Sequence, residues 1–124
     1  MNKASGYIEL TINGEVYPVK FGMGAWDIIS KGIGKPVSSM FTGIEEHEFL
    51  AWLIYGGLNY AHRAGYDNSK SIGSHYEAFD LLDEMDSEQM KQLAQVFLES
   101  KILGQTMGDY IKASAELNEK KKKK

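Results

Sequence analysis

The sequence predicts an α+β fold in which an N-terminal antiparallel β-hairpin packs on a bundle of about four to five α-helices. Two strand-like runs within residues 7–20 flank Asn13-Gly14, the strongest short-range signal for a hairpin. A long apolar segment at residues 43–63 and the amphipathic segments after it have helical spacing. Because an isolated hairpin is only marginally stable in water, the helices are expected to cover its apolar face.

The two-residue turn at Asn13-Gly14 sets the register of the predicted hairpin. Opposed residues share a face of the sheet, and the opposite face is mostly polar. Pro18 pairs with Glu9 at a non-hydrogen-bonded position and has no N–H, so the second strand is predicted to be an edge strand. The inward face is apolar except at its tip and consists of Ile8, Leu10, Ile12, Tyr17 and Val19.

A short helix is predicted at residues 25–31, with Trp26, Ile29 and Ile33 on its buried side. The glycines and the proline that follow are expected to stop it. The connector at residues 35–41 has room for one helical turn.

The central helix is predicted at residues 43–63, and Thr42 with Glu45 fits a capping box at its start. Aliphatic and aromatic side chains surround this segment on nearly every side, which is typical of a helix buried at the centre of a domain. Gly56-Gly57 in its middle costs on the order of 1 kcal/mol per residue relative to alanine. We therefore expect another backbone to approach closely there, with the hairpin as the candidate.

Two further helices are predicted after the polar loop at residues 66–73. Ser74 and Glu77 fit a second capping box. Asp86 or Ser87 is the expected N-cap of the next helix, so that the two helices form a helical hairpin with a tight connection. Their apolar stripes are Ala78, Leu81, Leu82 and Met85 in the first helix, and Met90, Leu93, Ala94, Phe97 and Leu98 in the second.

The 124 residues suffice for one domain, which we place at residues 1–119, followed by a disordered poly-lysine tail at residues 120–124. The chain has no cysteine, which excludes disulfides and thiolate metal sites. Five of its 14 basic residues form the lysine run, so residues 1–119 carry 9 basic against 17 acidic side chains. This acidic body argues against nucleic-acid binding except through the lysine tail. No segment resembles a signal peptide or is long enough to span a bilayer, so we expect a soluble, intracellular protein without a membrane partner.

No catalytic, cofactor-binding or metal-binding residue is predicted. Gly22-Met23-Gly24 follows a strand and precedes a helix, but Asp27 stands where a dinucleotide-binding loop has its third glycine. The three histidines are not spaced i, i+3 or i+4, so no helix face presents two of them as metal ligands. The acidic cluster at residues 80–88 lacks the EF-hand spacing and is expected to be solvated. Since no serine or threonine lies in a nucleophile-elbow context, we expect a protein that is not an enzyme.

Candidate partner-binding residues lie near the C-terminus. Beyond Gly104 the apolar pattern continues as Met107, Tyr110, Ile111 and Leu117, which predicts an amphipathic helix. Because such a helix can dock outward as readily as inward, Met107, Tyr110 and Ile111 are the candidates for partner contact. The methionines of the chain could line an adaptable groove for apolar helices or could simply fill the core, and the sequence leaves both interpretations open.

Four stretches carry a family resemblance: residues 10–25, residues 34–36, residues 53–58 and the acidic helical segment at residues 81–88. In these stretches the sequence resembles the tail assembly chaperones of long-tailed (siphovirus-like) bacteriophages and prophages. The resemblance implies a non-enzymatic protein that binds the tape-measure protein and helps bring tail-tube subunits to it. It also implies a site of action in the cytoplasm of the bacterial host and absence from the mature virion. Whether the chain forms a homo-oligomer stays open.

The lysine run at residues 120–124 has three interpretations: a solvated tail, a cloning remnant, or the translation product of a functional adenine-rich sequence in its own messenger RNA. Lysine codons are AAA and AAG, so five in succession require an adenine-rich track on which ribosomes can shift frame. Since the resembling family is often made as a short form and a frameshifted longer form, we hypothesise that this chain is the short product.

A second function fits the same sequence features. The alternative is a small structural phage protein, such as a head–tail connector or a tail component, that is retained in the virion. Mass spectrometry of purified virions would separate the two, because a chaperone should be absent from the particle.

Overall fold

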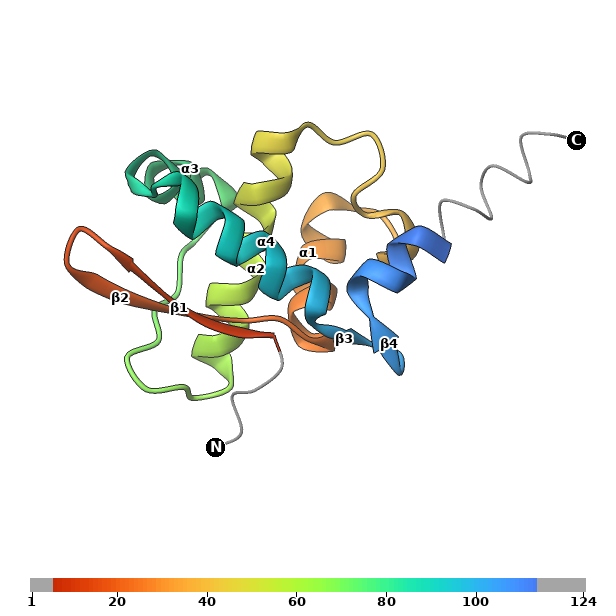
Figure 1. The fold of residues 1–124 in the computed structure, drawn as a ribbon, viewed down its shortest axis with the longest axis horizontal. Coiled ribbons are helices and arrows are strands. Elements are labelled where there is room, and N and C mark those ends of the chain that lie inside the picture. Colours follow the sequence, from red (N-terminus) through yellow and green to blue (C-terminus); the bar gives the residue numbers. More distant parts are fainter. Residues whose placement is uncertain (1–5, 114–124) are drawn as a thin grey trace, which may run out of the picture.

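The computed structural model describes residues 6–113 and has the predicted α+β architecture, with an N-terminal hairpin packed against helices (Figure 1). Residues 107–113 are helical as well. The predicted apolar position Leu117 and the predicted lysine tail lie outside the described residues. In chain order the elements are β1 (Tyr7–Ile12), β2 (Glu15–Lys20), α1 (Met23–Ile33), the 3₁₀ helix η1 (Val37–Ser39), α2 (Glu46–Arg63), α3 (His75–Glu84), α4 (Ser87–Glu99), β3 (Lys101–Ile102) and β4 (Gln105–Thr106).

The N-terminal hairpin has the predicted register, with Glu9 opposite Pro18. Asn13 and Gly14 both have positive φ angles, 52° and 80°. A type I′ turn requires this combination, and its twist matches that of the flanking strands. The apolar face of the hairpin points inward, and its fully buried members are Leu10, Ile12 and Val19.

Side chains from other elements cover the edges of the hairpin. Within the described residues β2 pairs only with β1, so it is an edge strand as predicted. Lys70 Nζ donates to the backbone oxygen of Val16 (2.5 Å), and Gln89 Nε2 of α4 donates to that of Thr11 (2.7 Å). Pro18 is buried although it lies on the face expected to be mostly polar. Open edges recruit strands from other chains, and these contacts reduce the number of backbone groups available for that.

α2 lies at the centre of the fold, in contact with β2, α1 and α3. A Cβ atom on Gly57 would lie 2.4 Å from Val19 Cγ1 of the hairpin. One on Gly56 would lie 2.4 Å from Ile29 Cγ1 and 3.1 Å from the backbone oxygen of Ala25, both in α1. The predicted close approach of another backbone is confirmed for α1 at Gly56, whereas at Gly57 a side chain of the hairpin fills the space.

The predicted capping box at Thr42 and Glu45 is wrong, because α2 begins only at Glu46. Glu45 is the N-cap residue, and its side chain makes no capping hydrogen bond. Gly43 has a φ of 74° in the turn that follows η1. Lys35 Nζ donates to the backbone oxygen of Thr42 (2.6 Å), so the segment that the sequence assigned to the helix is held as a loop.

α1 continues through Gly32, where the sequence predicted its end, and stops at Gly34, which has a φ of 84°. The missing side chain of Gly32 makes room for an aromatic ring from α2. A Cβ at this position would lie 2.5 Å from Trp52 Cζ3. Trp26 and Ile29 are buried as predicted.

The second capping box, formed by Ser74 and Glu77, is confirmed. Asp86 is the N-cap of α4, and its carboxylate accepts a hydrogen bond from the backbone N–H of Gln89 (2.8 Å). The tight connection between α3 and α4 is also confirmed, but the predicted helical hairpin does not form. Met85 is buried with extended backbone between the helices, and α3 packs on α2 whereas α4 packs on β1 (Figure 1).

A second, two-stranded hairpin of β3 and β4 follows α4, and the sequence did not predict it. Leu103 and Gly104 form its turn with φ angles of 49° and 87°. The backbone N–H of Met107 donates to the oxygen of Ser100 (2.8 Å) just beyond the paired strands. Leucine is rare at positive φ, so the turn has no local sequence signal on its first residue.

Candidate functional site

An aromatic cluster around Phe97 holds the C-terminal end of the described chain on the core. The Phe97 ring lies edge-on to Trp26 and Phe21, at centroid distances of 5.4 and 5.9 Å. It is also edge-on to Phe41, at 5.5 Å. Such edge-to-face pairs add to the stabilisation from burial. Trp26 Nε1 donates to the backbone oxygen of Lys101 (3.5 Å), which ties β3 to α1.

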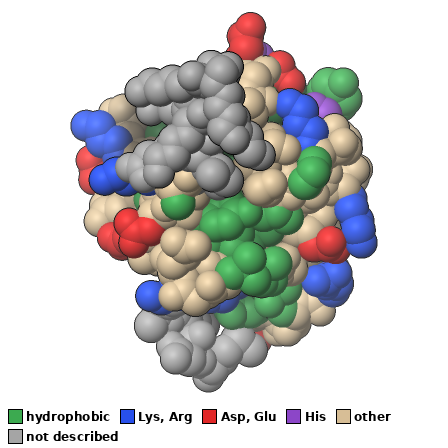
Figure 2. All heavy atoms as spheres, turned by 90° about the vertical axis from the view of Figure 1, so that its right-hand side faces the viewer, with side chains coloured by type: hydrophobic (Ala, Val, Ile, Leu, Met, Phe, Trp, Pro, Cys, Tyr) green, Lys and Arg blue, Asp and Glu red, His purple; other side chains and the backbone are tan. Residues whose placement is uncertain are grey.

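Exposed apolar side chains occur in the last turn of α4, in the β3–β4 turn and in the helix at residues 107–113. Leu98 in the last turn of α4 is 45% exposed, Leu103 in the β3–β4 turn is 72% exposed, and Ile111 in the terminal helix is 37% exposed. We call these three residues the C-terminal apolar face. Figure 2 views the molecule from the side on which β3, β4 and residues 107–113 lie, and hydrophobic side chains gather in the middle of that side.

The three partner-binding residues proposed from the sequence occupy different environments. Met107 is only 1% exposed and belongs to the core, so it offers no surface to a partner. Tyr110 is partly buried against the core, whereas Ile111 is exposed. Leu98, which the sequence placed on the buried stripe of α4, is exposed instead. The β3–β4 hairpin changes the direction of the chain between α4 and the terminal helix, and spacing within either helix does not reveal that change.

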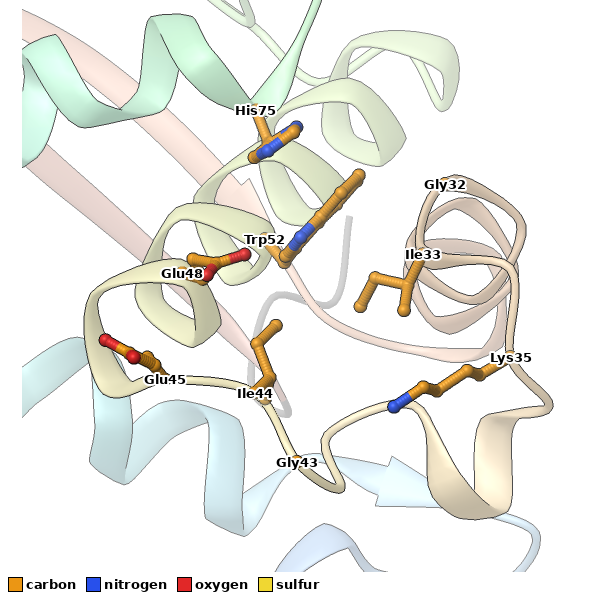
Figure 3. A pocket seen from close by; sticks show the side chains of 9 residues that line it. All are labelled: Gly32, Ile33, Lys35, Gly43, Ile44, Glu45, Glu48, Trp52 and His75. Carbon is orange, nitrogen blue, oxygen red and sulfur yellow. The ribbon is translucent and has the colours of Figure 1, made fainter.

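A pocket of about 460 Å³ opens between the end of α1, the connector to α2, and the starts of α2 and α3 (Figure 3). Sequence analysis did not find it, because its residues come from four separate segments. Ile33, Ile44 and Trp52 supply its apolar side, and Glu48 points into it from the first turn of α2. The lining residues are Gly32, Ile33, Lys35, Gly43, Ile44, Glu45, Glu48, Trp52 and His75.

Trp52 is held firmly at the back of this pocket. The imidazole of His75 stacks on its indole with a centroid distance of 4.1 Å and an interplanar angle of 15°. Tyr55 packs edge-on at 5.3 Å, and Gly32 leaves space for the edge of the ring. His75 thus serves as a stacking partner rather than as one of a set of metal ligands.

The remaining polar groups form no metal site within residues 6–113. No group of three or more His, Cys, Asp or Glu side chains there is placed to hold an ion. His62 Nδ1 lies 3.4 Å from Ser69 Oγ, and His47 Nδ1 lies 3.6 Å from Glu45 Oε2. The helices of the described part also lack the length and hydropathy that a bilayer-crossing helix needs. The acidic side chains expected to be solvated are exposed: Asp80, Asp83, Glu84, Asp86 and Glu88.

The shifted pKa values belong to the hairpin and not to the pocket. Burial, together with the hydrogen bond from Tyr7 Oη to Glu9 Oε2 (2.9 Å), raises the pKa of Tyr7 to about 12. Tyr66 stacks on this ring with a centroid distance of 5.3 Å. Burial also raises the pKa of Tyr17 and lowers the pKa of Lys20. These shifts follow from packing of the strands and do not converge on a reactive group.

Comparison with protein-family models, with curated proteins and with solved structures finds no match to this chain. The features that bear on function are therefore the C-terminal apolar face and the pocket between α1, α2 and α3. The first is apolar and exposed. The second combines an apolar side with charged side chains at its rim.

Proposed function

We propose that this protein is a non-enzymatic tail assembly chaperone of a long-tailed phage or prophage. It binds the tape-measure protein, helps to recruit tail-tube subunits in the cytoplasm of the bacterial host, and stays out of the mature virion. The observation that carries the proposal is the C-terminal apolar face, since exposed aliphatic side chains suit an apolar helical partner. The identity of the partner rests on the sequence resemblance.

Two of the stretches that carry the resemblance, residues 10–25 and 53–58, contact each other, which supports the proposal. Gly57, in the stretch 53–58, leaves the space that Val19 of the hairpin occupies. Thr11, also of the hairpin stretch, accepts a hydrogen bond from Gln89, which directly follows the acidic stretch at the start of α4. Residues 10–25 and 53–58, which are distant in the sequence, are therefore packed together in the fold.

The proposed mechanism is protection by mass action. A long apolar helical protein aggregates through its exposed surface, and a chaperone that covers this surface lowers the free concentration of the aggregating state. Three aliphatic side chains give modest affinity for one segment. Many copies along one tape-measure protein would protect it through repeated weak contacts.

The proposal is tested with the variant Leu103→Asp/Ile111→Asp in co-purification with the tape-measure protein from the same genome. Each buried aliphatic side chain contributes about 1.5 kcal/mol or more, so the double variant should bind roughly 100-fold more weakly. Aspartate tolerates the positive φ of residue 103, and residue 111 is exposed, so the fold should survive. Circular dichroism checks that it does.

Tyr76→Asp is the matched control, because Tyr76 is 68% exposed and lies on α3. It should bind the tape-measure protein as the unmodified chain does. If the double variant retains full binding, the C-terminal apolar face is not the contact. If the control loses binding equally, the loss reflects added negative charge rather than a local surface.

The alternative function, a structural phage protein retained in the particle, predicts a different location. Mass spectrometry of purified virions should detect no peptide of this chain if the chaperone proposal is right. Stoichiometric peptides in the particle would favour the connector or tail component instead.

The lysine codons bear on a further part of the proposal, that this chain is the short product of a frameshifted pair. An adenine-rich slippery heptamer within the codons for residues 120–124, followed by an overlapping open frame, is the expected gene arrangement. Scattered AAG codons without such a frame would contradict it.

A further inference from the structure

The pocket beside Trp52 is separate in chemistry from the C-terminal apolar face, and the proposed function makes no use of it. Its volume of about 460 Å³ lies within the range of small-ligand sites. Figure 3 shows Ile33 and Ile44 facing each other across it, with the Trp52 indole above them in this view. Lys35 approaches from one side and Glu48 from the other. Such a cavity accepts a ligand with a short apolar stem and a charged end.

We propose that this pocket binds an organic cation, an alkylammonium or guanidinium group carried on a short aliphatic stem. The unpaired carboxylate in the pocket belongs to Glu48. Its side chain makes no hydrogen bond or ion pair with any described residue, whereas Glu45 at the same rim has Oε2 3.6 Å from His47 Nδ1. The ammonium of Lys35 already donates to the backbone oxygen of Thr42 (2.6 Å), so it is directed toward the connector.

The apolar side of the pocket suits the stem of such a ligand. Ile33 and Ile44 offer aliphatic surface, and the stacking of His75 on Trp52 fixes the indole in one orientation. A rigid wall lowers the ordering cost of binding. The stem would bury its methylene groups against this wall while its charged end reaches Glu48, as lysine and arginine side chains do on protein surfaces.

The net negative charge of the chain also favours binding of a cation. Residues 1–119 carry 17 acidic against 9 basic side chains, which raises the local concentration of cations at the surface. The cation can come from a lysine or arginine side chain of a partner peptide or from a free amine. Both share the chemistry that Glu48 recognises, and the experiment separates them.

Binding can be followed through the two tryptophan indole N–H signals in a ¹H–¹⁵N spectrum of the full chain. Trp52 lines the pocket. Trp26 on α1 is fully buried against Phe97, does not line the pocket, and serves as the internal reference. Butylammonium, butyrate and neutral butylurea are titrated to about 100 mM at constant ionic strength, a range that detects millimolar dissociation constants. Only butylammonium should shift the Trp52 signal saturably.

Variants then locate the charge that is responsible. Glu48→Gln should weaken butylammonium binding roughly tenfold, because it removes the charge-assisted partner. Glu46→Gln is the matched control, since Glu46 lies two residues earlier on α2 but does not line the pocket, and it should bind as the unmodified chain does. Lys35→Met removes the opposing charge and should strengthen binding of the cation.

The outcomes decide the proposal in either direction. A Trp52 shift with butyrate that is lost in Lys35→Met would make the pocket an anion site and overturn it. Equal shifts with all three probes, or no saturable shift with any, would overturn it as well. If butylammonium binds as expected, Nα-acetyl-lysine N-methylamide and putrescine identify the source: tighter binding of the former supports a partner side chain, and tighter binding of the latter supports a free amine.

Discussion

The contact between α2 and the hairpin can be tested by adding a single methyl group in Gly57→Ala. The new Cβ would lie 2.4 Å from Val19 Cγ1 and 3.1 Å from Phe21 Cε1. Val19 is completely buried and β-branched, so its methyl group has no alternative position. Overpacking of this kind costs about 1–3 kcal/mol, and the helix propensity of alanine offsets about 1 kcal/mol of it. The free energy of unfolding should therefore fall, by up to about 2 kcal/mol.

The matched control is Gly108→Ala, the same chemical change in the terminal helix. The nearest atom to a Cβ there is the backbone oxygen of Leu98 at 3.5 Å, an ordinary van der Waals distance. Because there is no clash, the main effect is the lower backbone entropy of alanine in the unfolded chain. The free energy of unfolding of this variant should therefore rise by about 0.5–1 kcal/mol. Changes of opposite sign in the free energy of unfolding of these two variants would separate the effect of packing from the effect of helix propensity.

A double-mutant cycle isolates the contact itself. Val19→Ala alone removes two buried methyl groups and should cost about 2–3 kcal/mol. In the Gly57→Ala background the new methyl group takes part of the vacated space. The double variant should then be more stable than the sum of the two single changes by about 1–2 kcal/mol.

Urea unfolding, followed by circular dichroism and tryptophan fluorescence, measures all of these variants. The midpoint should move while the slope m stays constant. The packing of α2 on the hairpin would be refuted by a Gly57→Ala variant at least as stable as the unmodified chain. Additivity of the two substitutions to within about 0.5 kcal/mol would refute it equally.

Three further predictions concern single groups. Asp86→Ala should lower the unfolding free energy by about 1 kcal/mol in the same urea assay, because the N-cap hydrogen bond to the Gln89 N–H is lost. Asp86→Asn should keep most of that stability, because asparagine can also accept this hydrogen bond. Leu103→Gly should raise the melting temperature, since glycine adopts the φ of 49° without strain, and an unchanged or lower value would contradict the positive-φ turn. Tyr7 should ionise near pH 12 in an ultraviolet titration. Since the unfolded chain loses that proton near pH 10, the stabilisation is complete below pH 10 and lost as the pH rises to about 12, and Tyr7→Phe should flatten this part of the stability profile.

The hairpin could be predicted in detail because its information is local. Asn13 and Gly14 define the turn, and the pleat then assigns every side chain between Tyr7 and Lys20 to one face. The cap at Asp86 is local in the same sense, as is the capping box of α3. Gly56-Gly57 was informative for another reason: two glycines inside a helix need a compensating contact, and the structure supplies it.

Predictions failed where two local signals competed or where a contact came from far along the chain. Thr42 and Glu45 have the spacing of a capping box, but the loop around them is held by Lys35 and by the positive φ of Gly43. Gly32 resembled a helix stop, yet it is the space into which Trp52 fits. The proposed contact residue Met107 lies in the core.

By itself the sequence determined the first hairpin and its pairing, the approximate positions of the helices, and that one long helix is buried at the centre. Only the tertiary structure decided which apolar side chains near the C-terminus are exposed and which segments meet around Trp52. Periodicity reports the faces of a single element, whereas exposure depends on the neighbour that packs against each face. The unpredicted turn at Leu103 and Gly104 changes that neighbour for every residue after α4.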